Sequence, residues 1–216
     1  VLGLDSQADA IAARARTLGE QIRQISKAKL DLAGEAIRDT VQPLPEWNSI
    51  RDRVCFIIAG DVTYGMAHDV PRPEISTGRM VRGSDLDIVV IAEDDVPKEA
   101  LKVMDEAILR KKHYLLVHPN YQEEIDYLVK DVAKVHLQLE FDTFQHMIAS
   151  KILDEGELLF GSGSLFRKVK AMVDETGVQG KIAALERQAA ESRKDAEASL
   201  LDADALQGDP AFLNLF

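Results

Sequence analysis

The 216-residue chain is long enough to bury a sizeable core, and its apolar content of 46% is that of a globular protein. Its net charge of −11 argues against a nucleic-acid-binding surface, because neutralising a phosphate backbone requires clustered Lys and Arg. The single cysteine, Cys55, excludes an intramolecular disulfide and favours a reducing compartment. With neither a signal peptide nor a membrane-length apolar run expected, we predict a cytoplasmic protein with no membrane or long nucleic-acid partner.

The N-terminal residues are predicted to form one long helix. Apolar residues recur at helical spacing, and the pattern ends before Pro43. Asp5 and Ser6 are candidates to cap the helix, and Gly34 marks a candidate break. The apolar positions are Ile11, Ala12, Leu18, Ile22, Ile25, Leu30, Leu32 and Ile37.

Predicted strands and helices alternate through the rest of the chain. Unbroken or alternating apolar runs predict strands over residues 54–59, 86–92, 123–130 and 135–141. Helical spacing predicts helices over 97–112 and 143–155, and a charged helical segment begins at Gln179. These elements predict an α/β (α+β) core with a mixed β-sheet, flanked by long N- and C-terminal helices.

The most informative motif is Ser84-Asp85-Leu86-Asp87, where the predicted strand over residues 86–92 begins. Successive strand side chains point to opposite faces, so Asp85 and Asp87 share a face with their Cα atoms roughly 7 Å apart. Two carboxylates this close repel each other unless a cation lies between them, and Mg²⁺ suits such a pair and recruits phosphates. In phosphatases with an Asp-x-Asp nucleophile the apolar strand precedes the first Asp, whereas here it follows. That order favours metal binding over phospho-aspartate chemistry.

Two further features accompany this motif. The predicted strand over 54–59 ends in Gly60-Asp61, and a lone Asp126 lies within the strand predicted over 123–130. This order of motifs resembles the nucleotidyltransferase superfamily of the DNA polymerase β type. The order is a strand with a glycine turn, then Ser-Asp-x-Asp on a strand, then a lone Asp in a strand. The resemblance covers about residues 50 to 165.

The resemblance implies a magnesium-dependent reaction in which a nucleoside monophosphate moves from a nucleoside triphosphate (NTP) to an acceptor, releasing pyrophosphate. It implies two Mg²⁺ ions and a catalytic, metal-binding set formed by Asp85, Asp87 and Asp126. It also implies that Gly60 lets the backbone approach the triphosphate, and that the short apolar segment over 156–161 closes the core.

Several residues leave alternatives open. Glu124 lies on the same predicted strand face as Asp126 and is the other candidate for the third carboxylate. Asp61 stands where the family usually has Ser or Gly, and its carboxylate would repel a triphosphate unless it turns outward or binds metal. A hydroxyl from Thr63 or Ser84 is then the candidate replacement. The candidate nucleotide-binding residues are therefore Gly60, Asp61, Thr63, Ser84 and Arg82.

The stretch from Met66 to Arg82 makes the gap between the glycine turn and the aspartate pair longer than is usual in the family. We interpret this stretch as an inserted structureless loop. Arg72, Arg79 and Arg82 within it are candidates for bidentate phosphate contacts, and the alternative is a solvated loop.

The sequence thus predicts an N-terminal helical extension over 1–45, a nucleotidyltransferase core over 46–165 and a C-terminal helical segment over 166–216. The expected acceptor hydroxyl belongs to a small molecule or a protein, and the oligomeric state is left open. The alternative function is a non-catalytic nucleotide-sensing or partner-binding module on the same fold, in which Asp61 has disabled the phosphate turn. A glycosyltransferase that uses a sugar nucleotide is disfavoured by the Gly60 turn and the small core.

Overall fold

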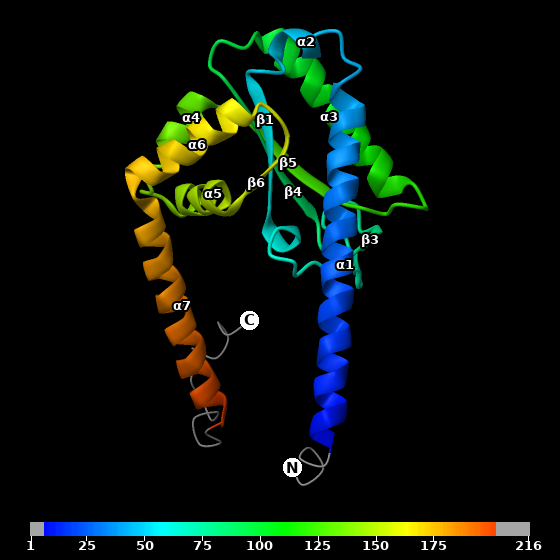
Figure 1. Ribbon diagram of the computed structural model, residues 1–216, viewed down its shortest axis with the longest axis vertical. Helices are drawn as coiled ribbons and strands as arrows, with labels where there is room; N and C mark the ends of the chain where they lie inside the picture. The colour runs from blue at the N-terminus through cyan, green and yellow to red at the C-terminus, as the bar shows by residue number, and fades with distance from the viewer. Residues whose placement is uncertain (1–6, 202–216) are drawn as a thin grey trace.

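A mixed four-stranded sheet lies between two layers of helices in the computed structural model, which describes residues 7–201 (Figure 1). The strand order is β5-β4-β1-β6. The strand β1 (Val54–Ala59) pairs antiparallel with both β4 (Leu86–Ala92) and β6 (Glu157–Gly161). The strand β4 pairs parallel with β5 (Ile125–Asp131) at the edge of the sheet. The predicted α/β fold with a mixed sheet is confirmed.

The two central strands, β1 and β4, are apolar along most of their length because helices cover both of their faces. On one face lie α1 (Ala8–Val41), α2 (Trp47–Ile50) and α3 (Lys98–Val117). On the other face lie α4 (Val132–Gln138), α5 (Phe144–Glu155), α6 (Gly163–Thr176) and the start of α7 (Val178–Leu201). Leu86 and Ile88 belong to the first layer, and Val89 and Ile91 to the second.

The helix α1 is more regular than the sequence indicated. It runs without interruption from Ala8 to Val41, so there is no break at Gly34. A Cβ atom at Gly34 would lie 3.7 Å from Leu159 Cδ1, which places this glycine where the helix packs on β6. The predicted capping residues, Asp5 and Ser6, lie outside the described residues.

The strand predicted over residues 135–141 is wrong, because Val132–Gln138 forms the helix α4. Val132, Val135 and Leu139 are all buried, and their spacing is that of one helical face. The Asp131 side chain caps this helix by accepting a hydrogen bond from the Lys134 N–H. The apolar residues of this segment are thus compatible with both periods, and in the structure the helical face packs in the core.

The remaining predicted elements differ from the structure mainly at their ends. The strand predicted from residue 123 begins at Ile125, and the helix predicted over 97–112 continues to Val117. The helix predicted over 143–155 is confirmed by α5, and the segment over 156–161 forms the edge strand β6.

The insertion over residues 66–82 is not structureless. It contains a hairpin formed by β2 (Pro71–Pro73) and β3 (Met80–Arg82). The helix α1 holds both ends of this insertion. The Ser26 hydroxyl accepts a hydrogen bond from the Ala67 N–H at 3.0 Å, and Lys29 Nζ donates to the Arg82 carbonyl at 2.7 Å. Lys29 also forms a buried ion pair with Glu123, so α1, the hairpin and the start of β5 are linked at one point.

Candidate metal centre

The aspartate pair enters the sheet through a tight turn. Gly83 has a φ of +62°, and a Cβ atom there would lie only 1.9 Å from the His68 carbonyl oxygen. Only glycine fits at this position, and the next residue, Ser84, donates its N–H to the same carbonyl at 3.0 Å. The chain then enters β4 with Leu86 fully buried, so Asp85 and Asp87 project on the opposite face.

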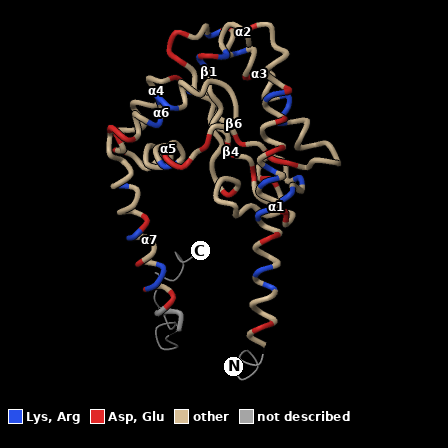
Figure 2. Tube along the Cα trace, in the orientation of Figure 1, with Lys and Arg blue, Asp and Glu red and all other residues tan. Residues whose placement is uncertain are grey.

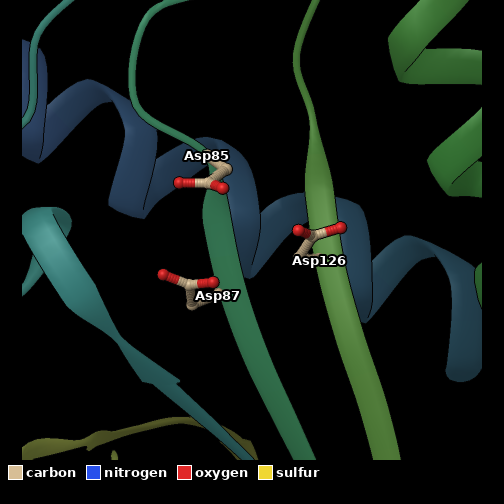
Figure 3. A group of neighbouring side chains, drawn as sticks. All are labelled: Asp85, Asp87 and Asp126. Carbon is tan, nitrogen blue, oxygen red and sulfur yellow. The ribbon is translucent and has the colours of Figure 1, made fainter. Parts of the chain in front are cut away.

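The third aspartate comes from the neighbouring parallel strand. Asp126 on β5 is in register with Asp87 on β4. Asp85, Asp87 and Asp126 each offer a carboxylate oxygen, and these oxygens lie within 4.8 Å of one another. Figure 3 shows the three side chains on the same side of the two strands. These carboxylates lie close enough to hold a metal ion.

The electrostatics of this triad favour a bound cation. Burial, the negative charges of Asp85 and Asp126, and smaller effects of Asp61 and Glu124 together raise the pKa of Asp87 to about 6. The pKa of a carboxyl group rises when its ionised form is poorly solvated and surrounded by like charges. A divalent cation relieves both causes, and an all-carboxylate set of oxygen ligands suits a hard cation.

Two basic side chains contact the triad from outside the sheet. Arg72 Nη2, from the hairpin, lies 3.5 Å from Asp85 Oδ2 and 2.8 Å from Glu124 Oε2. Its Nε donates to the Gly83 carbonyl at 2.8 Å, which fixes the guanidinium beside the turn. Lys112 Nζ, from α3, donates to Asp126 Oδ1 at 2.8 Å. The sequence does not single out Lys112, because a lysine in a charged helix carries no signal of its long-range partner.

The structure separates the two candidates for the third carboxylate. Asp126 belongs to the triad, whereas Glu124 is buried and pairs with Arg72. Burial raises the pKa of Glu124, and the positive charge of Arg72 opposes that rise. Glu124 therefore anchors the arginine beside the triad.

The glycine turn after β1 lies against the triad. Gly60 has a φ of +78°, and a Cβ atom at this residue would lie 2.5 Å from Asp87 Oδ2. The nearby hydroxyl groups already have partners. Ser84 Oγ donates to Asp61 Oδ2 at 2.8 Å, and Thr63 Oγ1 donates to the Gly60 carbonyl at 2.8 Å. The structure thus brings Gly60, Asp61 and Ser84 to the triad, with the Asp61 carboxylate held by a hydrogen bond.

Arg82 is not part of this group. Together with Lys29, Asp69 and Glu123, it lines a separate cavity of about 150 Å³ beside α1. Among the arginines of the insertion, Arg72 is the one for which the structure gives a contact to the triad.

The comparisons with known proteins found neither a family model nor a curated protein that matches this chain. Within residues 7–201, none of the helices combines the length and the apolar character that crossing a membrane requires. The fold and the geometry of its carboxylates therefore define the chain as an α/β protein with a candidate metal centre at one end of a mixed sheet.

Proposed function

We propose that this chain is a Mg²⁺-dependent nucleotidyltransferase that transfers a nucleoside monophosphate from an NTP to an acceptor hydroxyl. The observation that carries the proposal is the convergence of Asp85 and Asp87 from β4 with Asp126 from the adjacent parallel strand. The Gly60 turn approaches this triad from β1, as the resemblance to the DNA polymerase β type of nucleotidyltransferase requires.

The residues present fit magnesium and a triphosphate. Asp85, Asp87 and Asp126 would hold the metal, since they supply carboxylate oxygens only and share a surplus of negative charge. When bound, Mg²⁺ would neutralise phosphate charge and lower the pKa of the attacking hydroxyl. Phosphoryl transfer needs little further covalent help from the protein, because positioning and charge neutralisation provide most of the catalysis.

Arg72 and Lys112 have a second role in this proposal. Their contacts to Asp85 and Asp126 balance part of the negative charge of the triad. Both side chains compete with a cation for these carboxylates, and once displaced from them they are placed to contact phosphate oxygens. The guanidinium of Arg72 remains positioned through Glu124 and the Gly83 carbonyl, so it can contact a phosphate without leaving the site.

The acceptor that we propose is a small molecule or a protein. Figure 2 shows Lys and Arg interspersed with Asp and Glu along α1 and α7. With a net charge of −11, this pattern offers little attraction to the backbone of a long nucleic acid.

The metal dependence of nucleotide binding tests the proposal. ATP and GTP are titrated calorimetrically into the wild type and into Asp87→Asn, first with Mg²⁺ and then with a chelator. We expect binding that requires both Mg²⁺ and the Asp87 carboxylate. Equal binding under all four conditions would refute the metal-site assignment.

One observation favours the alternative, a non-catalytic nucleotide-sensing or partner-binding module. Asp61 places a further carboxylate beside Asp87, and the Ser84 and Thr63 hydroxyl protons are engaged within the protein. A phosphate at this turn would be repelled by the Asp61 carboxylate. It would also find no free hydroxyl proton on Ser84 or Thr63. Release of pyrophosphate, measured with a panel of acceptors, separates the two functions. A chain that binds NTP but releases no pyrophosphate with any acceptor is a sensor.

A further inference from the structure

The buried Lys29 of α1 contacts two chain segments that lead into the metal centre. Its ammonium donates to the Arg82 carbonyl at 2.7 Å and forms an ion pair with Glu123. Arg82 precedes Asp85 by three residues. Glu123 stands at the same interval before Asp126. The Lys29 side chain therefore links equivalent points on the two segments that deliver the carboxylates.

The sheet alone does not fix the position of Asp85 relative to Asp126. Asp126 lies within β5, whereas Asp85 comes before Leu86, the first residue of β4, and so precedes the paired ladder. At this end of the ladder the Leu86 N–H donates to the Glu124 carbonyl at 2.9 Å. The place of the Asp85 carboxylate therefore depends on how the chain before β4 is held.

Lys29 reaches this point from the other face of the sheet. Figure 3 shows α1 behind the two strands, on the far side from the carboxylates. The Arg82 N–H donates to the Gln122 carbonyl at 2.8 Å, and the contacts of Lys29 to Arg82 and Glu123 reinforce this backbone bond. The spacing of the two segments thus depends in part on a side chain that belongs to neither of them.

Stability is a weak reason for a buried ion pair at this place. The side chains of Lys29 and Glu123 are 4% and 6% exposed. Burial raises the pKa of Glu123, and the hydrogen bond and charge of Lys29 oppose that rise. Removing two charges from water costs free energy, and apolar residues of similar volume often stabilise a fold as well as a buried ion pair does. What apolar residues cannot do is donate hydrogen bonds to two segments at once.

We propose that Lys29 is a positioning residue for the metal centre, which fixes the separation between the turn that carries Asp85 and the strand that carries Asp126. The inference rests on the function proposed above. The oxygens of the triad lie within 4.8 Å of one another, and Mg²⁺ requires near-octahedral ligands at about 2.0–2.1 Å. A small change in the spacing of the two segments therefore weakens metal binding. Residues that support metal ligands from behind commonly change metal affinity by about 10- to 100-fold.

Binding of Mn²⁺ in the absence of nucleotide, measured from the EPR signal of the free ion, tests the proposal. Lys29→Met/Glu123→Leu replaces both charges with apolar side chains, so the net charge near the triad is unchanged. We expect a melting temperature in chelator close to that of the wild type and a Mn²⁺ dissociation constant raised by about tenfold or more. The control, Lys168→Met/Glu93→Leu, removes an ion pair beyond the other end of β4 and should leave the constant within about twofold of wild type.

Glu123→Gln separates position from charge. Its amide oxygen still accepts a hydrogen bond from Lys29, so we expect a Mn²⁺ dissociation constant within about threefold of wild type. The ammonium is left buried without a counter-charge, so the melting temperature should fall. The fluorescence of Trp47, the only tryptophan and a buried one, reports whether each variant is folded. If the apolar pair does not fold, Lys29→Gln/Glu123→Gln, a neutral pair of shorter reach, is expected to show the same rise in the Mn²⁺ constant.

A folded double variant that binds Mn²⁺ as tightly as the wild type would overturn the proposal. So would a Glu123→Gln variant that loses as much affinity as the double variant. A wild type that binds no Mn²⁺ would overturn both this role and the proposed function. A wild type that binds Mn²⁺ with the expected dependence on Lys29, but releases no pyrophosphate from NTP, would support the positioning role and count against the transfer reaction.

Discussion

Replacing Asp87 by Asn is expected to stabilise the metal-free protein, although it removes a proposed catalytic group. Burial and the neighbouring carboxylates raise the pKa of Asp87 from its ordinary value of 3.8 to about 6. A raised carboxyl pKa means that the folded protein disfavours the charged form, so ionisation of Asp87 destabilises the fold. The destabilisation is absent below pH 3.8, develops as the pH rises from 3.8 to 6, and is complete at neutral pH.

The magnitude follows from the size of the shift. A change of about two pKa units corresponds to about 3 kcal/mol, and solvent screening at this half-buried group reduces it to about 1–2 kcal/mol. For a chain of this size, Asp87→Asn should raise the melting temperature by about 3–6 °C at pH 7.5 in a chelator. Most of this gain should disappear at pH 4, where Asp87 is largely protonated in the folded chain and partly protonated in the unfolded one.

Magnesium should reverse the order of stability. A metal present at 100 times its dissociation constant stabilises the wild type by about 2.7 kcal/mol, and Asp87→Asn should lose most of that increment. Differential scanning calorimetry in chelator and in Mg²⁺ measures both effects. Asp52→Asn, at a highly exposed carboxylate, serves as the control and should move the melting temperature by about 1 °C at most. An Asp87→Asn variant that melts below the wild type in chelator at pH 7.5 would refute this account of the triad.

The other predictions concern the third carboxylate, the glycine turn and the acceptor. Asp126→Asn should keep much of the NTP affinity but reduce the rate of pyrophosphate release by about 100-fold or more. Glu124→Gln should reduce that rate by about tenfold or less. The opposite result would make Glu124 the third carboxylate in place of Asp126. Gly60→Ala should cost about 1–3 kcal/mol of stability and weaken Mg²⁺ binding, because its Cβ would meet Asp87. Gly65 has a similar positive φ, but no atom lies near the position of an added Cβ. The control variant Gly65→Ala should therefore show the loss of stability in calorimetry without weaker Mg²⁺ binding. Labelled single-stranded RNA and duplex DNA should not bind at micromolar concentration in low salt, and binding that weakens steeply with added salt would contradict the proposed acceptor class.

The part of the site that lies on one strand was predictable from the sequence. The apolar run after Ser84 predicts a buried strand, and the period of two then places Asp85 and Asp87 on one face. The closeness of Asp126 depends on β5 pairing parallel with β4 in one particular register, and hydrophobic pattern alone does not specify which strands pair. The resemblance to a known family supplied that expectation, which rested on the order of motifs along the chain.

The basic residues around the site were harder to predict, for a physical reason. Arg72 and Lys112 reach the triad through long, flexible side chains from a hairpin and a helix that the sequence does not place near it. Strands as short as Pro71–Pro73 and Met80–Arg82 leave almost no periodic signal, so the sequence predicts a structureless loop where the hairpin forms. The strand predicted over 135–141 failed for a related reason, since a segment this short satisfies helical and strand spacing equally well.

The attachment of the hairpin to α1 has a consequence for how this protein tolerates sequence change. Ser26 and Lys29, one turn apart, hold the two ends of the segment that carries Arg72. Inserting or deleting a single residue between them would rotate one anchor by about 100° relative to the other, so both could not be satisfied at once. The position of the Arg72 guanidinium beside Asp85 therefore depends on the directions in which Ser26 and Lys29 project from α1, a helix that packs on the other face of the sheet. Homologues with an insertion or deletion between the positions of Ser26 and Lys29 should therefore also have a different residue at the position of Arg72.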